Sequence, residues 1–216
     1  MPKGPLYIIG AGNQSKVLLS MIEECGRECA GIFDDDEKLF GTTLRGSTVK
    51  GRISDMPDRE ETEAVIAIGD NKIREDITGR FRKVRWSVLV HPEACIHSSV
   101  QMLEGSVIFP GTIIHAESLI GRHVIINSAA VLGYETKIGD FSHIGMRSSI
   151  ADKVIIEKNV LLGMGSVVIP KVHIFNDVTI GAGSTIIKNL GPGGVYVGNP
   201  ARRVLRPIID TEEPEE

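Results

Sequence analysis

The residues best suited to chemistry begin with a glycine-rich turn near the N-terminus. Gly10-Ala11-Gly12 follows the apolar segment 6–9, and Asp34 comes 22 residues after Gly12. A glycine-rich turn that opens a helix offers backbone N–H groups and the positive end of the helix dipole to a phosphate. A carboxylate about 20 residues further on is well placed to bind a ribose hydroxyl. The spacing therefore indicates a nucleotide site.

The nucleotide fingerprint is incomplete, so three interpretations stay open. Ser15 stands where the pattern G-x-G-x-x-G has its third glycine, which normally lets the helix pack closely on the strand. The turn could bind a nicotinamide or flavin dinucleotide, or it could be a structural turn without a ligand. It could also bind a different nucleotide, such as a nucleotide-sugar. The missing glycine favours this last interpretation.

The spacing of histidine and cysteine argues against a metal site. The sequence has no H-x4-H pair and no C-x2-C pair, and its three cysteines are Cys25, Cys29 and Cys95. Structural zinc sites need several such ligands at short, regular spacings. We therefore expect no metal. We expect surface or interface packing for four further histidines, namely His97, His115, His123 and His173.

A repeat of six residues organises the second half of the chain. Every sixth residue from Val90 to Ile186, seventeen positions in all, is a long aliphatic residue or Met. The residue four places after each of the first sixteen is small or β-branched. A period of six does not match a helix, which needs apolar residues at steps of three and four. The positions are Val90, Ile96, Met102, Ile108, Ile114, Ile120, Ile126, Leu132, Ile138, Ile144, Ile150, Ile156, Leu162, Val168, Ile174, Ile180 and Ile186.

The repeat predicts a stack of triangular coils. Each unit of six is a short strand followed by a corner, and three units close one coil of 18 residues with the aliphatic side chains inside. Stacked coils bring these side chains above one another at the strand spacing of about 4.8 Å. Seventeen repeats make between five and six coils, which predicts a prism roughly 25 Å long.

Ahead of the repeats, strand patterns alternate with helical ones. We predict strands at 6–9, 30–33, 63–68 and 84–90, a short strand near Thr48, and helices at 15–24 and 72–82. Such alternation is typical of a small parallel α/β sheet. The 216 residues have room for two modest domains.

Composition narrows the class of partner. With 42% hydrophobic and 24% charged residues, the chain resembles an ordinary globular protein. The net charge of −4 argues against nucleic acid as the partner. We find no apolar run of the roughly 20 residues that a membrane span needs, and no secretory signal at the N-terminus. A cytoplasmic location without membrane contact is expected.

The repeats and several short motifs together resemble those of one bacterial group. This is the hexapeptide-repeat sugar acetyltransferases, in the subfamily of sialic-acid O-acetyltransferases and UDP-4-amino-sugar N-acetyltransferases. The resemblance covers about residues 5–206. Its marks are Tyr7-Ile-Ile-Gly-Ala-Gly12, Phe33-Asp-Asp35, Ala67-Ile-Gly-Asp-Asn71-Lys-Ile-Arg74, His91-Pro92, Ile125-Ile-Asn127, Ile138-Gly-Asp-Phe-Ser-His143 and Val197-Gly-Asn-Pro-Ala-Arg202.

The resemblance implies the fold and the domain organisation. Residues 1–88 would form a small Rossmann-like α/β domain that binds a nucleotide-sugar. Residues 89–206 would form a left-handed parallel β-helix that binds acetyl-CoA between the subunits of a homotrimer. The acidic segment 207–216 would be a disordered tail.

The resemblance also assigns ligand contacts. The nucleotide-sugar, UDP-linked in the subfamily, would contact Gly12, Asn13, Gln14, Asp34, Asp35 and Asn71. Where the family usually has Gly-His-Gly in the first turn, this chain has Asn13-Gln14-Ser15, which puts sugar recognition in question. Acetyl-CoA would contact His143, Gly145, Asp152, Gly163, Met164, Gly181 and Ala182. Three of these glycines recur every 18 residues, which indicates either a groove for the pantetheine arm or a tight turn repeated in each coil.

The catalytic position shows a second departure from the family. The family's histidine base corresponds to Tyr134, which Glu135 follows, while His143 is retained beside the expected acetyl group. The reference pKa of tyrosine is about 10, against about 6.5 for histidine, so a phenol is a poor base at neutral pH. A general base contributes about 10²–10⁴ in rate. An alcohol acceptor would lose that contribution in full, whereas an amine can attack a thioester unaided.

We therefore predict an acetyltransferase that acts on the amine of a nucleotide-linked sugar, most consistent with UDP, in glycan biosynthesis. Glu135 or water would take the proton, and Tyr134 would donate a hydrogen bond to the acceptor or to the developing oxyanion. Two alternatives remain open at this point. One is a sugar O-acetyltransferase, and the other is a non-catalytic binding or scaffold relative.

Overall fold

The computed structural model describes residues 5–204, so the predicted tail at 207–216 lies outside the described residues. The N-terminal part folds around a six-stranded sheet of order β3-β4-β2-β1-β5-β6. Its neighbours are parallel except for the β3–β4 hairpin, so the predicted parallel sheet is in fact mixed. The strands are β1 (Leu6–Ile9), β2 (Cys29–Phe33), β3 (Thr43–Leu44), β4 (Ser47–Gly51), β5 (Glu63–Ile66) and β6 (Arg85–Trp86).

Two helices cover opposite faces of this sheet. Successive strand residues point to opposite sides, so Ile8 packs with α1 (Asn13–Glu24) while its neighbour Ile9 packs with α2 (Asn71–Thr78). The predicted helix at 72–82 ends early, because Asp58 accepts hydrogen bonds from the backbone N–H groups of residues 82–84 and holds them in a loop. Two short 3-10 helices complete the domain, η1 (Glu37–Leu39) and η2 (Ile53–Asp55).

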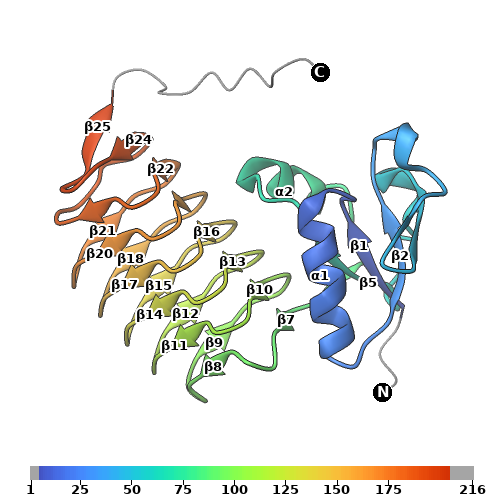
Figure 1. The fold of residues 1–216 in the computed structure, drawn as a ribbon, viewed down its shortest axis with the longest axis horizontal. Coiled ribbons are helices and arrows are strands. Elements are labelled where there is room, and N and C mark those ends of the chain that lie inside the picture. The colour runs from blue at the N-terminus through green and yellow to red at the C-terminus, as the bar shows by residue number, and fades with distance from the viewer. Residues whose placement is uncertain (1–4, 205–216) are drawn as a thin grey trace.

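The rest of the described chain forms the predicted parallel β-helix, called the solenoid below (Figure 1). Each coil contributes one two- or three-residue strand to each of three parallel sheets. The first sheet contains β7 (Leu89–Val90), β10 (Val107–Ile108), β13 (Ile125–Ile126), β16 (His143–Ile144), β19 (Leu161–Leu162) and β22 (Val178–Ile180). The second contains β8 (Cys95–Ile96), β11 (Ile113–Ile114), β14 (Val131–Leu132), β17 (Ser149–Ile150), β20 (Val167–Val168) and β23 (Thr185–Ile186). The third contains β9 (Gln101–Met102), β12 (Leu119–Ile120), β15 (Lys137–Ile138), β18 (Ile155–Ile156) and β21 (His173–Ile174).

The corners between these sheets form three edges of the prism. The first edge lies between the first and second sheets and includes residues 145–148, 163–166 and 181–184. The second edge lies between the second and third sheets and includes 133–136 and 151–154. The third edge lies between the third and first sheets and includes 139–142 and 157–160.

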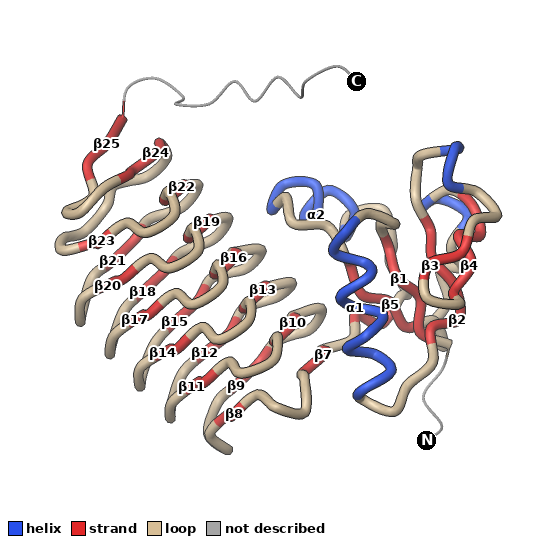
Figure 2. Tube along the Cα trace, viewed as in Figure 1, coloured by secondary structure: helices blue, strands red, loops and turns tan. Residues whose placement is uncertain are grey.

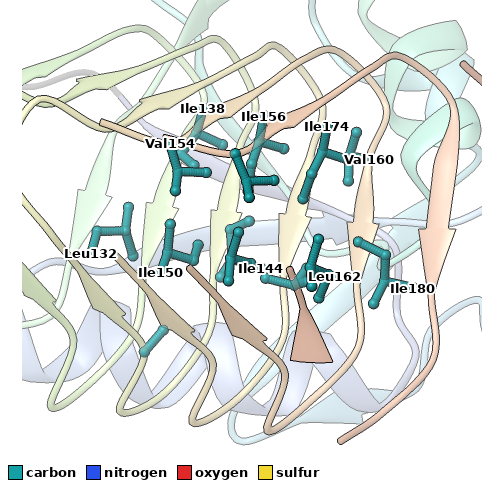
Figure 3. Close-up of a cluster of buried hydrophobic side chains, with 14 of the residues drawn as sticks. Leu132, Ile138, Ile144, Ile150, Val154, Ile156, Val160, Leu162, Ile174 and Ile180 are labelled. Atoms are coloured by element: carbon teal, nitrogen blue, oxygen red, sulfur yellow. The ribbon is translucent and has the colours of Figure 1, made fainter. Parts of the chain in front are cut away.

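The interior of the solenoid confirms the aliphatic repeat. From Ile108 onward every sixth residue is buried, and the side chains line up coil by coil along the axis (Figure 3). Small residues sit at the corners, where serines replace missing backbone partners. Ser142 Oγ donates to the carbonyl of Glu157 at 2.7 Å and accepts from the N–H of Val160 at 3.0 Å. The core is therefore both dry and hydrogen-bonded.

The C-terminal strands close the far end of the stack. β24 (Gly194–Val197) pairs in parallel with β22, and β25 (Arg202–Val204) pairs antiparallel with β24. These strands cover the last coil and leave only the short β25 at that edge of the first sheet. Figure 2 shows this end of the solenoid pointing away from the N-terminal domain.

The N-terminal domain packs on the outer face of the first sheet. The outward side chains of its first three strands, Leu89, Val107 and Ile125, are buried in one core cluster with Leu18 and Ile22 of α1. Further along the same sheet, the outward position belongs to His143. The site described next lies where this apolar contact ends.

Candidate functional site

The carboxyl ends of β1, β2 and β5 lie side by side at one end of the sheet. The N–H of Gly10 donates to the carbonyl of Phe33 at 2.8 Å, and the N–H of Ala67 donates to the carbonyl of Ile9 at 2.7 Å. The chain leaves β1 through α1 to reach β2 on one side, while β5 lies on the other side. Such a point of reversal is where open α/β sheets bind ligands. The glycine-rich turn therefore lies in the position predicted for a nucleotide site.

Asp34 fastens the glycine-rich turn. Its Oδ2 accepts from the N–H of Ala11 at 2.6 Å, and its Oδ1 accepts from the N–H of Asp36 at 2.8 Å. The neighbouring Asp35 accepts from the N–H of Ile53 at 3.0 Å and lies 3.4 Å from a guanidinium nitrogen of Arg80. Both carboxylates thus help to hold loops, and Asp35 remains largely exposed.

Ser15 explains the missing third glycine. Its side chain is fully buried between α1 and the sheet, and its hydroxyl donates to the carbonyl of Gly10 at 2.5 Å. A small residue is therefore still needed there, and the hydroxyl adds a bond that a glycine lacks. Gly10 has φ of +98°, and a Cβ on it would lie 2.8 Å from Ile68, so this glycine is required by both conformation and space.

The loop between β5 and α2 connects the carboxyl ends of the strands with the solenoid. Asp70 caps α2 by accepting from the N–H of Ile73 at 2.9 Å, and Gln14 lies beside Gly69. Between this loop and the first sheet lies a hollow of about 220 Å³. Its walls come from both domains and consist of Gly69, Asp70, Asn71, Lys72, Asn159, Leu161, Asp177 and Thr179.

His143 stands at the rim of this contact. It projects outward from β16, is half-buried, and its Nδ1 lies 3.4 Å from the carbonyl oxygen of Gly69. Burial, and secondly the positive charge of Arg74, lowers the pKa of His143 to about 4. The ring is therefore neutral at pH 7. With its proton on Nδ1 toward Gly69, its Nε2 is a hydrogen-bond acceptor.

Tyr134 and Glu135 lie on a different part of the solenoid, the second edge. The N–H of Tyr134 donates to Asp152 at 3.1 Å, and its ring is 44% exposed. The ammonium of Lys153, one coil further on, lies 5.5 Å from the centre of that ring and 3.4 Å from a carboxylate oxygen of Glu135. This corner offers a phenol, a carboxylate and an ammonium, but within one chain it does not share an edge or sheet with His143.

Apart from His143 on the first sheet, the predicted acetyl-CoA residues divide between two edges. Met164, 55% exposed, and Ala182 lie on the first edge, whereas Asp152 lies on the second edge with Tyr134. These two edges are the borders of the second sheet. The outer face of that sheet carries Ile113 and Val167, which are 38% and 42% exposed.

The three stacked glycines on the first edge are explained by coil packing. A Cβ on Gly145 or Gly163 would lie 2.6 Å from backbone atoms of the next coil, and one on Gly181 would lie 2.7 Å from Val197. Gly133, on another edge, would meet the backbone N of Asp152 at 2.7 Å. The tight-turn interpretation therefore accounts for these glycines without a ligand, and a role in binding acetyl-CoA stays a prediction.

The four further histidines named above lie away from the carboxyl ends of β1, β2 and β5. His97 and His115 are exposed, and His173 lies 2.7 Å from Glu157 on the third sheet. His123 is 3% exposed and stacks on Phe141 where the two domains meet. Among residues 5–204, no three histidine, cysteine or acidic side chains gather where they could hold a metal ion. In the same part of the chain, no helix is long and apolar enough to span a membrane.

Known protein families match both parts of this architecture. The model for the PglD N-terminal domain matches residues 5–81. The model for the bacterial transferase hexapeptide, with six repeats, matches residues 135–170 and 153–188. The two matches fall on the α/β domain and on the middle of the solenoid.

Solved structures of sugar-modifying enzymes share the whole fold. A variant of perosamine N-acetyltransferase from Caulobacter crescentus, with one histidine changed to asparagine, was solved with CoA and GDP-perosamine. It is 30% identical with a TM-score of 0.85, over 93% of this chain and 97% of that one. The acetyltransferase domain of PglB from Neisseria gonorrhoeae, solved with acetyl coenzyme A, is 27% identical with a TM-score of 0.84, over 93% and 98%.

One further relative matches in part. An uncharacterized protein of Acanthamoeba polyphaga mimivirus is 34% identical over 121 residues. These residues make up 56% of this chain and 24% of the viral protein, so the chain spans about a quarter of that relative's length.

A small α/β domain of PglD type, packed on a hexapeptide solenoid, defines a hexapeptide-repeat acetyltransferase. Within that class, the chain belongs to the PglD-type sugar N-acetyltransferase family, since it matches a 30% identical member over nearly its full length. The resemblance inferred from the sequence is thereby confirmed.

Proposed function

We propose that this protein transfers the acetyl group of acetyl-CoA to the amino group of a nucleotide-linked amino sugar. The observation that carries the proposal is the contact between the loop that follows β5 and the solenoid, where His143 Nδ1 lies 3.4 Å from the Gly69 carbonyl. A nucleotide-sugar bound at the carboxyl ends of β1, β2 and β5 would place its sugar near His143. The relatives solved with CoA and GDP-perosamine or with acetyl coenzyme A support the same pair of substrates.

The nucleotide is proposed to be UDP, as expected from the sequence, and GDP is the competitor. The Caulobacter relative was solved with a GDP-linked sugar, while the resemblance to UDP-4-amino-sugar enzymes favours uridine. The carboxylates of Asp34 and Asp35 can accept from a ring N–H of either base, so these two residues do not separate the candidates. Direct comparison of the two nucleotides is therefore part of the test.

The chemistry requires an amine to attack the thioester carbon. A C–N bond forms, the C–S bond breaks, the amine loses one proton, and the departing CoA thiolate takes up one. His143 Nε2 accepts a hydrogen bond from the amine, which leaves the nitrogen lone pair free for attack. Tyr134 donates to the developing oxyanion or the acceptor, and Glu135 or water takes the proton.

We propose a homotrimer because, within one chain, His143 and Tyr134 lie on different parts of the solenoid. A complete site would need residues from two subunits. The first and second edges border the same outer face of the second sheet. Covering that face with a second copy would bury Ile113 and Val167 and bring the first edge of one subunit near the second edge of another. An exposed apolar face of this kind is typical of a surface that binds a partner.

The test is acetyl transfer by the purified protein, measured as release of free CoA thiol and as product mass. UDP- and GDP-linked amino sugars are offered beside the same sugars with a hydroxyl in place of the amine. Turnover restricted to amines supports the proposal, and faster turnover of the hydroxyl sugars contradicts it. His143→Asn should lower the rate, whereas the control His173→Asn, on the third sheet, should not.

Tyr134 is tested in the same assay. Tyr134→Phe removes one donor to a charged group, worth about 1.5–3 kcal/mol, and should lower kcat about 10- to 100-fold. Tyr134→His supplies a base, so it should raise transfer to hydroxyl sugars more than transfer to amino sugars. If wild-type protein binds neither CoA nor any nucleotide-sugar in titration calorimetry, the proposed function is wrong.

A further inference from the structure

Arg74 is a buried charge that joins the two domains. Its side chain projects from α2 and is 1% exposed. Nε donates to the carbonyl of His123 at 3.2 Å, and Nη2 donates to the carbonyl of Phe141 at 2.6 Å. Both carbonyls belong to corners of the solenoid. One guanidinium therefore binds two successive coils.

The same guanidinium holds the loop before α2. Nη1 donates to the carbonyls of Ile68 at 3.1 Å and Gly69 at 2.8 Å, and Nη2 donates to the side chain of Asn71 at 2.8 Å. All five acceptors are uncharged oxygens. Removing a cation from water costs several kcal/mol when no anion compensates it, and burial lowers the pKa of Arg74 to about 10. An apolar side chain would avoid this desolvation cost, but it would leave these carbonyls without donors.

What an apolar side chain lacks is a fixed fork of donors. The planar guanidinium presents five N–H groups in a rigid arrangement, which a lysine does not reproduce. Here the guanidinium fixes four backbone carbonyls, two from each domain, relative to one another. The Gly69 carbonyl is the important one, because it accepts from Arg74 at 2.8 Å and faces His143 Nδ1 at 3.4 Å.

The surroundings of His143 make it sensitive to this arrangement. From α2 and its cap, the nearby charged groups are Arg74 and Asp70. Within the first sheet, the outward neighbours of His143 in the adjacent coils are apolar, Ile125 on one side and Leu161 on the other. Orientation of the ring therefore depends on the Gly69 carbonyl, and its protonation depends on burial and on Arg74.

We propose that Arg74 is a positioning residue for acetyl transfer. It fixes the Gly69 carbonyl against the solenoid, so that His143 keeps its proton on Nδ1 and presents Nε2 to the sugar amine as an acceptor. This inference rests on the proposed function for its catalytic consequence, but the state of the His143 ring can be measured without any substrate.

The first experiment observes the ring directly. Protein labelled with 15N-histidine is titrated by NMR, and His143→Asn identifies the His143 signals. Wild-type His143 should be the Nδ1–H tautomer and should stay unprotonated down to about pH 5, since its pKa is about 4. In Arg74→Met the ring should mix both tautomers, and its pKa should rise toward the ordinary value.

The second experiment measures kinetics. Arg74→Met should lower kcat about 100-fold, as expected when reacting groups are misplaced by about 1 Å, with little change in KM for acetyl-CoA. Arg74→Lys, which keeps the charge but not the fork, should recover only part of kcat. Arg27→Met is the matched control, because Arg27 is a half-buried arginine that pairs with Glu63 inside the N-terminal domain. It should leave the tautomer and the titration of His143 unchanged, whatever it does to the melting temperature.

Two results would overturn the inference. One is a wild-type His143 that carries its proton on Nε2. The other is an Arg74→Met protein with the wild-type tautomer and titration, or, if that variant does not fold, an Arg74→Lys protein with wild-type kcat. Absence of acetyl transfer to every sugar, together with the predicted NMR changes, would refute the proposed function and leave the positioning of His143 by Arg74 supported.

Discussion

The solenoid and the seam between the domains are held together in opposite ways. In the solenoid, the same aliphatic contact recurs in every coil, and each contact resembles its neighbours. In the seam, defined by the 67–70 loop and α2 against residues 122–123, 141–143 and 158–159, single polar groups make unique contacts. The repeated aliphatic contacts stabilise the scaffold, while the single polar contacts of the seam fix the position of His143.

The largest expected effect removes one repeat contact. Ile144 is fully buried inside the coil that carries His143, so Ile144→Ala should cost about 2–5 kcal/mol in the free energy of unfolding. Ile155, 38% exposed on the third sheet, is the matched control, and Ile155→Ala should cost below about 0.5 kcal/mol. Urea unfolding measures both. Equal losses at the two positions would contradict the assignment of inward and outward residues.

The next expected effect is a pH dependence of the free energy of unfolding that comes from the two histidines of the seam. Burial, with a smaller contribution from Arg74, lowers the pKa of His123 and of His143 to about 4, against about 6.5 in the unfolded chain. Between these values the unfolded state binds more protons, so stability is complete above about pH 6.5 and falls by a few kcal/mol as the pH drops toward 4.

Urea unfolding at a series of pH values measures this slope. His123→Asn and His143→Asn should each flatten it, because each removes one proton-binding difference. The exposed His97 lies in the first coil, and His97→Asn should leave the slope unchanged. A wild-type stability that stays constant from about pH 6.5 to pH 4.5 would contradict the buried, neutral state of the seam histidines.

A smaller effect is expected at two serines that lie at corners of the solenoid. Ser142 and Ser166 are both buried, and each hydroxyl donates to a carbonyl of the next coil, at 2.7 and 3.3 Å. Ser142→Ala removes the donor to the Glu157 carbonyl and should cost about 1–3 kcal/mol, whereas Ser166→Ala should cost less, because the Gly181 carbonyl still accepts from Ser184 Oγ at 2.7 Å. Only Ser142 adjoins Phe141 and His143, so only Ser142→Ala should also lower kcat. Equal losses of kcat in both variants would show that kcat is no more sensitive to a substitution beside the seam than to one elsewhere in the solenoid.

The smallest effect on stability belongs to the second edge. Glu135 and Lys153 form a pair with side chains that are 42% and 43% exposed, and such pairs contribute about 0–1 kcal/mol. Glu135→Gln should therefore leave the melting temperature nearly unchanged but lower kcat if Glu135 takes the proton. Glu157→Gln, which breaks the pair with His173 on the third sheet, is the control and should leave kcat unchanged.

The scaffold could be predicted from the sequence because its signal is periodic. Each coil repeats the same requirement, so seventeen positions report one structure, and the inward residues from Ile108 onward are all buried. The end of α2 at Thr78 escaped prediction because Asp58, distant in sequence, binds the N–H groups of residues 82–84. The β3 hairpin strand escaped because a two-residue strand has no period.

The seam could be predicted only in part. The glycine-rich turn, Asp34 and His143 are recognised by motif, and the structure places both Gln14, just after this turn, and His143 beside Gly69. Arg74 ends the motif Ala67–Arg74, but the motif indicates no role for it. A signal was present, since Arg74 and the buried Ile77 are three residues apart and share one helix face. A charged residue on a buried face needs partners, and the sequence does not say that carbonyls of two distant coils supply them.

We propose that acetyl transfer occurs between the seam of one subunit and the second edge of another. The most direct test of this proposal mixes two impaired variants. Tyr134→Ala alters the second edge, and His143→Asn alters the seam, so neither homotrimer contains an intact site.

In trimers assembled from equal amounts of the two variants, each site draws its edge and its seam from different subunits. About a quarter of the wild-type rate should be recovered after co-refolding, because one combination in four restores both groups. A mixture no more active than its separate components would contradict a site shared between subunits.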